Sequence, residues 1–195
     1  KDYKDSMERS WEQMSPEARE QMERNFGGFE REFGTSERTG YEAAGREHEA
    51  ATREYEAATR EFEAPMREYE VISGYGPRRD PLNGEAAMHF GLDMTGPPGS
   101  PVLAAASGRV AFAGWKARYG KIVEIDHGIG VRTRYGHLRR VSVRAGESVK
   151  GGHVVGEMGS TGRSAGPHLH YEILVKGEPR DPMRFIQAGQ NVRKE

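Results

Sequence analysis

The stretch Gly166-Pro167-His168-Leu169-His170-Tyr171-Glu172 runs directly into the apolar residues Ile173-Leu174-Val175, a pattern typical of a buried β-strand. Side chains alternate between the two faces of a strand, so we expect His168 and His170 on one face and Leu169 on the core face. The two imidazoles then lie about 7 Å apart along the strand. That spacing suits one metal ligand beside one catalytic group, and a purely structural pair of histidines is the alternative.

The residues around this strand predict a β domain. Composition changes at Ser73-Gly74-Tyr75-Gly76-Pro77, and from there to Phe185 short β-branched runs alternate with glycine-containing turns. The expected strands are 102–106, 108–113, 121–126, 131–135, 154–158 and 168–175. No convincing helix of ten residues is expected among them. We therefore expect a mainly antiparallel β-sandwich or barrel-like domain over residues 73–186, followed by a tail at 187–195.

The first third of the chain has a different pattern, rich in Glu, Arg, Ala and Met. Large residues recur every seven positions, each followed three places later by a mostly small one: Tyr41, His48, Tyr55, Phe62 and Tyr69, then Ala44, Ala51, Ala58, Pro65 and Ile72. This repeat predicts a helical hairpin or coiled-coil arm over residues 1–72, and with the β domain an α+β chain. The long helix is expected from near 36 to 70, with Pro65 bending it or ending its regular part.

The sequence does not identify what this arm packs against. An alanine-rich seam buries little area alone, so we expect it to pack on its own first helix, on a second copy in a homodimer, or on another protein. A solvated single helix is the remaining alternative.

Composition excludes several classes of protein. The 195 residues hold 29 Lys and Arg against 30 Asp and Glu, a net charge of -1, which argues against nucleic acid as a partner. No apolar run reaches the roughly 18 residues of a membrane span. The chain has no cysteine, so disulfides and thiolate metal sites are excluded. It begins at Lys1 and shows no signal-peptide pattern, so we expect a processed product or an expression fragment.

Histidines gather in the expected β domain. Six of the seven lie there; His89 precedes Asp93 by four residues, and His137 follows an expected strand. Imidazole and carboxylate together suit zinc, and three protein ligands with one open position are typical of a catalytic site. His89, Asp93 and one histidine of the His168-Leu169-His170 stretch would form such a trio, with the other histidine and His137 unligated beside it.

From Ser73 to about Phe185 the chain resembles the lysostaphin-like, or LytM-type, zinc peptidases of peptidoglycan. The shared motifs are Ser73-Gly74-Tyr75-Gly76-Pro77-Arg78, then His89 through Asp93, Gly136-His137-Leu138, and Gly159 through Glu172. The resemblance implies the LytM fold, zinc ligands at His89, Asp93 and His170, and an unligated catalytic pair, His137 and His168. The helical arm lies outside it.

The function that this resemblance implies is a zinc endopeptidase that hydrolyses peptide cross-links of peptidoglycan through a zinc-bound water, with one of the two unligated histidines as the base. Peptidoglycan peptides as substrate imply a periplasmic, envelope or extracellular location. Glu172, two residues beyond His170 on the same face, is expected either to orient that imidazole or to be a surface acid. The alternative function is a non-enzymatic wall scaffold or an activator of a wall amidase. We expect the helical arm to serve assembly or regulation, and an active β domain inhibited by its own arm is a third hypothesis.

Overall fold

The computed structural model of the chain describes residues 62–192, with side chains to residue 190. The chain divides into two compact units, whose described parts are residues 76–89 and residues 62–75 with 90–192. The predicted helical arm lies almost wholly outside the described residues. Its seam, His48 and any partner it binds therefore stay predictions.

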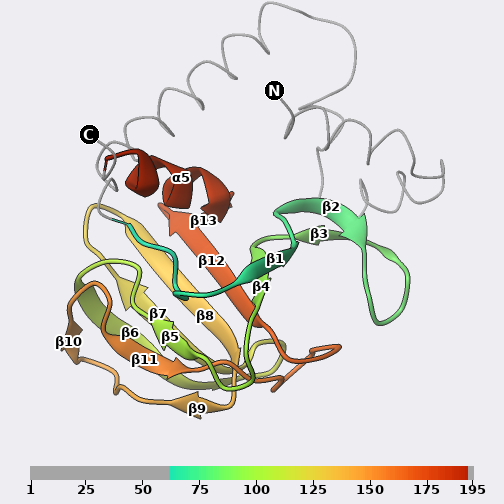
Figure 1. Cartoon of the computed structure of the whole chain (residues 1–195), viewed down its shortest axis with the longest axis horizontal. Coiled ribbons are helices and arrows are strands. Elements are labelled where there is room, and N and C mark those ends of the chain that lie inside the picture. Colours follow the sequence, from blue (N-terminus) through green and yellow to red (C-terminus); the bar gives the residue numbers. More distant parts are fainter. Residues whose placement is uncertain (1–61, 193–195) are drawn as a thin grey trace, which may run out of the picture. The chain divides into compact units, whose positions relative to one another are not determined.

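The described chain consists of short strands with one helix at the end (Figure 1). In order, they are β1 (Glu70–Ser73), β2 (Gly76–Arg79), β3 (Ala86–His89), β4 (Leu92–Thr95), β5 (Pro101–Leu103), β6 (Gly108–Lys116), β7 (Gly120–Asp126), β8 (Val131–Leu138), β9 (Arg140–Val141), β10 (Ser148–Val149), β11 (Val154–Glu157), β12 (Leu169–Val175), β13 (Glu178–Arg180) and α5 (Pro182–Val192).

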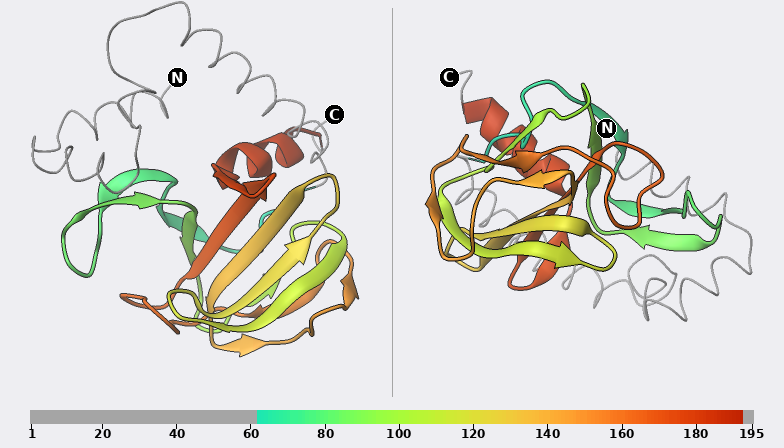
Figure 2. Two further views of the ribbon diagram at one scale, coloured as in Figure 1. Left: turned by 180° about the vertical axis from the view of Figure 1, so that it is seen from behind. Right: turned by 90° about the horizontal axis from the view of Figure 1, so that it is seen from below.

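The larger unit is built on one sheet with the order β1-β4-β12-β8-β7-β6-β10, to which β13 adds beside β12. A second sheet has the order β5-β11-β9. Every pairing in both sheets is antiparallel. The views in Figure 2 show β12, β8, β7 and β6 side by side, with β12 reaching toward α5 at one end. The expectation of a mainly antiparallel β domain is confirmed.

β12 is an inner strand of this sheet, and both of its faces are buried. Leu169, Tyr171 and Ile173 are fully buried on the core side. His170 and Glu172 alternate with them and are buried on the other side, at 9% and 2% exposure. The strand pairs with β4 along one edge and with β8 along the other. The alternation predicted from the sequence is therefore present, and it separates an apolar face from a polar face that is also buried.

Helix α5 was not expected. Its N-terminus is well specified, because the Asp181 carboxylate accepts a hydrogen bond from the Met183 N–H at 3.0 Å and Pro182 occupies the first helical position. Phe185 and Ile186 are buried, at 0% and 2% exposure. The helix continues through residues 187–192, where the sequence predicted a tail.

The predicted long helix does not extend through residues 62–70. This segment is irregular up to β1, and its main chain pairs with the stretch around β5: the Glu63 N–H donates to Ala105 O, and the Leu103 N–H donates to Pro65 O, both at 2.8 Å. Proline lacks the N–H that a helix interior requires. Phe62 and Met66 instead bury their side chains, at 5% and 1% exposure. Phe62, which fits the seven-residue repeat in the sequence, is thus a core residue of the larger unit in the structure.

The described part of the smaller unit is a hairpin, in which β2 pairs antiparallel with β3 from Gly76↔His89 to Arg79↔Ala86. Its turn is closed by the Gly84 N–H, which donates to Asp80 O at 2.8 Å, and Gly84 has a φ of 74°. A positive φ is where glycine costs least. The hairpin ends at His89, one of the predicted metal ligands.

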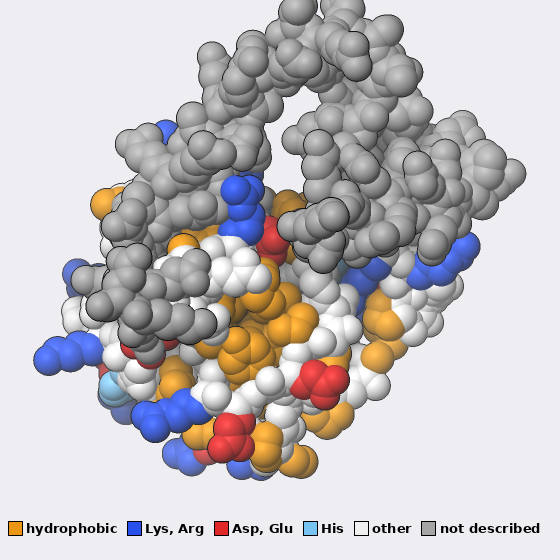
Figure 3. Space-filling model, turned by 45° about the horizontal axis from the view of Figure 1, so that its top comes forward, with side chains coloured by type: hydrophobic (Ala, Val, Ile, Leu, Met, Phe, Trp, Pro, Cys, Tyr) orange, Lys and Arg blue, Asp and Glu red, His pale blue; other side chains and the backbone are white. Residues whose placement is uncertain are grey.

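The described surface is mixed in character. On the face drawn in Figure 3, hydrophobic side chains gather near the centre, and charged side chains of both signs lie around them. Within residues 62–192 no helix is long and apolar enough to cross a membrane.

Candidate active site

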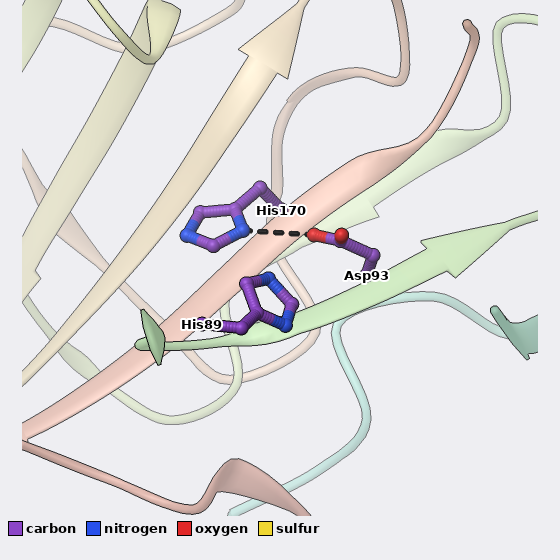
Figure 4. Close-up of side chains that lie close together, drawn as sticks. All are labelled: His89, Asp93 and His170. Carbon is purple, nitrogen blue, oxygen red and sulfur yellow. Dashed lines mark hydrogen bonds and ion pairs between the residues drawn. The ribbon is translucent and has the colours of Figure 1, made fainter. Parts of the chain in front are cut away.

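Three predicted ligands come together in the structure. His89 at the end of β3, Asp93 in β4 and His170 in β12 each offer one ligand atom, and these atoms lie within 4.8 Å of one another (Figure 4). All three residues are buried. Asp93 and His170 face each other because they are direct partners in the antiparallel β4–β12 pair. Two imidazoles and one carboxylate at this spacing fit a zinc ion with an open coordination position.

His170 lies between two carboxylates. Its Nδ1 is 2.8 Å from Asp93 Oδ1, and its Nε2 is 2.9 Å from Glu172 Oε1. Burial alone would lower the pKa of His170, but the hydrogen bonds to Asp93 and Glu172 outweigh burial and raise it to about 9. Since Nδ1 is the nitrogen that faces Asp93, it is the atom placed to join that carboxylate on a metal. Nε2–H is then left to donate to Glu172, an arrangement that orients a ligand imidazole.

Glu172 receives donors from three sides. Tyr119 Oη donates to Glu172 Oε1 at 2.8 Å, and Arg134 Nη1 donates to Glu172 Oε2 at 3.1 Å. Arg134 also contacts Glu124 Oε1 through Nε at 2.7 Å. Burial opposes ionisation of Glu172, but the bonds from His170, Tyr119 and Arg134 lower its pKa below the usual value. The sequence left two alternatives for Glu172, a residue that orients His170 or a surface acid. Because Glu172 is buried, the surface acid is wrong.

The imidazoles of His137 and His168 form a pair next to this centre, with ring centroids 4.7 Å apart. Each Nδ1 faces a main-chain carbonyl: His137 Nδ1 is 2.7 Å from Thr161 O, and His168 Nδ1 is 2.8 Å from Gly166 O. A carbonyl can only accept, so both Nδ1 atoms carry a proton, and in the neutral form of either ring the lone pair is on Nε2. Burial lowers the pKa of His137 to about 4, which keeps the ring neutral near pH 7.

His137 is held in an unusual backbone conformation, with a φ of 61°. A non-glycine residue in this left-handed region is strained and is found most often where surrounding contacts impose it. Two contacts impose it here. The His137 N–H donates to Tyr119 O at 2.7 Å, and its ring donates to Thr161 O. The ring centroid lies 5.8 Å from that of His170.

The structure thus brings together all five residues predicted for the site. The roles of His89, Asp93 and His170 as ligands and of His137 and His168 in proton transfer stay predictions. His153 is exposed on a turn, apart from these residues, and His127 contacts Ser107 O and Thr133 Oγ1. Sequence reasoning missed Tyr119 and Arg134. Arg134 lies in a strand that also holds Arg132 and Thr133, so residue type and position alone do not single it out.

Comparisons with known proteins agree with this geometry. Residues 87–182 match peptidase family M23. The catalytic domain of the antimicrobial peptidase lysostaphin from Staphylococcus simulans is 37% identical with a TM-score of 0.56, over 61% of this chain and 92% of that chain. A zinc-containing peptidase from Vibrio cholerae is 36% identical with a TM-score of 0.57, over 64% of this chain and 38% of that chain.

Among curated proteins, the peptidoglycan DD-endopeptidase ShyC of Vibrio cholerae is 41% identical over 121 residues, which are 62% of this chain and 28% of that protein. The chain belongs to peptidase family M23, and its antiparallel β domain has the fold of the lysostaphin catalytic domain. It spans about a quarter of the length of the curated relatives that it matches.

Proposed function

We propose that this chain is a zinc-dependent endopeptidase that hydrolyses peptide cross-links of bacterial peptidoglycan. The observation that carries the proposal is the group of ligand atoms from His89, Asp93 and His170 within 4.8 Å, next to the paired imidazoles of His137 and His168. Membership of peptidase family M23 and the zinc-containing relative support it. Two imidazoles and one carboxylate are also the donors that catalytic zinc sites use.

The residues divide into two groups with different tasks. His89, Asp93 and His170 hold the zinc, and when bound the ion supplies Lewis-acid polarisation of a carbonyl and activation of water at neutral pH. His137 and His168 present Nε2 lone pairs, so they accept a proton from the attacking water and return one to the leaving amine. Glu172 orients His170 and takes no proton from the substrate.

The proposed substrate is a direct cross-link between D-alanine and diaminopimelate, because the relative ShyC is named a peptidoglycan DD-endopeptidase. Peptidoglycan lies in the cell envelope, so we propose a periplasmic or extracellular location. Mass spectrometry of the fragments released from defined muropeptides tests the bond. Release of fragments only from glycine-bridged muropeptides would contradict the direct-link assignment.

Two substitutions separate the metal from the chemistry. We expect His170→Ala to lose zinc, since one of three ligands is gone, and to lose hydrolysis with it. His137→Ala should keep zinc and lower hydrolysis of purified peptidoglycan by a factor of about 10² to 10⁴. Zinc content after dialysis and soluble fragment release are the two measurements.

His153→Ala is the matched control, because this histidine is exposed and outside the site; both readouts should stay at the level of the unchanged chain. Normal digestion by His137→Ala would overturn the catalytic assignment. An unchanged chain that holds no metal and releases no fragments would favour the non-enzymatic scaffold or amidase activator instead.

A further inference from the structure

The turn between β6 and β7 contacts both groups of residues in the site. Tyr119 lies in this turn, and its hydroxyl donates to Glu172 at 2.8 Å. Its ring lies tilted against the imidazole of His170, with centroids 5.7 Å apart. Its main-chain carbonyl accepts the N–H of His137 at 2.7 Å. One residue therefore touches a proposed zinc ligand by its ring, that ligand's carboxylate partner by its hydroxyl, and a proposed catalytic histidine by its backbone.

On the metal side, Tyr119 completes the set of donors that fixes Glu172. Glu172 Oε1 lies 2.9 Å from His170 Nε2 and also accepts the Tyr119 hydroxyl, while Arg134 occupies Oε2. Arg134 is held in turn by Glu124, which also pairs with Lys116 at 2.7 Å. Because Glu172 is only 2% exposed, water cannot readily replace a lost donor. The orientation of His170 thus depends on the Tyr119 hydroxyl.

On the catalytic side, the same turn is locked to the loop that carries Thr161. The Arg163 N–H donates to Arg118 O at 2.9 Å, and the Lys121 N–H donates to Thr161 Oγ1 at 3.0 Å. A Cβ on Gly120 would collide with the carbonyl carbon of Thr161, so the two segments are in direct contact. Thr161 O accepts His137 Nδ1. His137 is therefore hydrogen-bonded to both the β6–β7 turn and the loop at Thr161, and these two segments are hydrogen-bonded to each other.

We propose that Tyr119 is a positioning residue that couples the two halves of the site, orienting His170 through Glu172 and holding His137 through its own carbonyl. The proposal rests on the proposed zinc peptidase function. It assigns to the β6–β7 turn the task of fixing the distance between the metal and the proton-transfer pair.

Tyr119→Phe tests the metal side, because it removes the hydroxyl and keeps the ring and the carbonyl. In the full 195-residue chain, we expect zinc affinity to fall by about 10- to 100-fold, measured with zinc alone against a competing chelator. With cobalt(II) alone as the probe, we expect the visible ligand-field spectrum to change, since the orientation of a ligand imidazole changes. General loosening of the fold would not alter that spectrum at saturating metal.

Tyr171→Phe is the matched control, because Tyr171 neighbours His170 in β12 and its buried hydroxyl has no hydrogen-bond partner among the described residues. Its zinc affinity and cobalt spectrum should match those of the unchanged chain. Zinc affinity of Tyr119→Phe within twofold of that control, with an unchanged spectrum, would overturn the proposal for the metal side.

Thr161→Val tests the catalytic side, because it removes the hydroxyl that joins the loop to the β6–β7 turn and nearly keeps the side-chain volume. We expect kcat at saturating zinc to fall at least tenfold while zinc affinity stays within threefold. An unchanged kcat would overturn the coupling. If the unchanged chain binds no zinc and cleaves nothing, the proposed function fails instead, so the two failures are distinguishable.

Discussion

At the scale of the residue, the chemistry of this chain depends on which acceptor each histidine nitrogen faces. Both nitrogens of His170 face carboxylates, whereas the Nδ1 atoms of His137 and His168 face main-chain carbonyls. A carboxylate stabilises a ligand imidazole, and a carbonyl fixes a tautomer without adding charge. His168 and His170 therefore look alike in the sequence, two residues apart in one motif, but their Nδ1 atoms face different acceptors in the structure.

His127 shows how a histidine outside the site affects stability. Its ring nitrogens contact Ser107 O at 2.9 Å and Thr133 Oγ1 at 2.8 Å, and its ring packs edge-on against Phe62. Burial lowers the pKa of His127 below its usual value, against the smaller effects of Ser107 and the Asp126 carboxylate.

The pH dependence of stability follows from that shift. Below the unfolded pKa of about 6.5 the unfolded chain binds a proton that the native His127 resists, so the free energy of unfolding falls as pH falls from 6.5. We expect His127→Gln to lose less stability than the unchanged chain between pH 7.5 and pH 5.5, measured by urea unfolding. His137 and His170 titrate equally in both chains, so they cancel in the difference. Equal losses would contradict the prediction.

At the scale of the element, strands carry most of the site residues, and a turn and a loop hold one of them in place. β12 and β4 bring His170 opposite Asp93 by antiparallel register, but His137 is held by the β6–β7 turn and by the loop at Thr161. Gly120 lies where these two segments meet and has a φ of 66°. A side chain there meets both an unfavourable backbone angle and main-chain atoms of the loop.

Gly120→Ala is therefore expected to lower the free energy of unfolding by at least about 2 kcal/mol. Gly177→Ala is the matched control, because Gly177 also has a positive φ, 86°, but nothing lies within 4 Å of its added Cβ. That control should cost about 1 kcal/mol from the backbone angle alone. Urea unfolding of both variants measures the difference, and equal costs would show that the contact with Thr161 is not restrictive.

At the scale of the whole molecule, the β unit begins before the position at which sequence composition changes. Phe62 and Met66 are buried, and Pro65 and Glu63 pair with residues 103 and 105. A fragment that begins at residue 73 lacks all of these contacts.

We expect residues 73–195 to unfold at lower urea concentration than residues 62–195, with a loss of about 3 kcal/mol or more, because two large buried side chains are missing. This matters for testing whether the predicted helical arm inhibits the domain: residues 62–195 are the proper comparison with residues 1–195. Equal urea midpoints for the two fragments would show that the segment 62–72 adds no stability.

The sequence predicted the site residues more completely than it predicted the strands and the helix. The five site residues could be found from the H-L-H spacing, the His89–Asp93 pair and the resemblance to LytM-type peptidases, because those motifs are short and local. The strands with clear apolar runs were also predictable. β1, β2, β3, β4, β9, β10 and β13 were not among the expected strands, because two to four residues carry little periodicity of their own and pair only where a neighbouring edge is available. Helix α5 was missed although Asp181 and Pro182 form a recognisable start.

By itself the sequence determined the antiparallel β class, the face that His168 and His170 share, and the set of candidate ligands, since alternation and residue type are properties of the chain alone. Only the tertiary structure decided that Glu172 is buried against Tyr119 and Arg134, that His137 adopts a positive φ, and that Phe62 belongs to the β unit. These facts depend on contacts between residues far apart in the chain, such as Tyr119 and Glu172, which are 53 positions apart. Such contacts form only when separate segments fold against each other, and no local pattern encodes them.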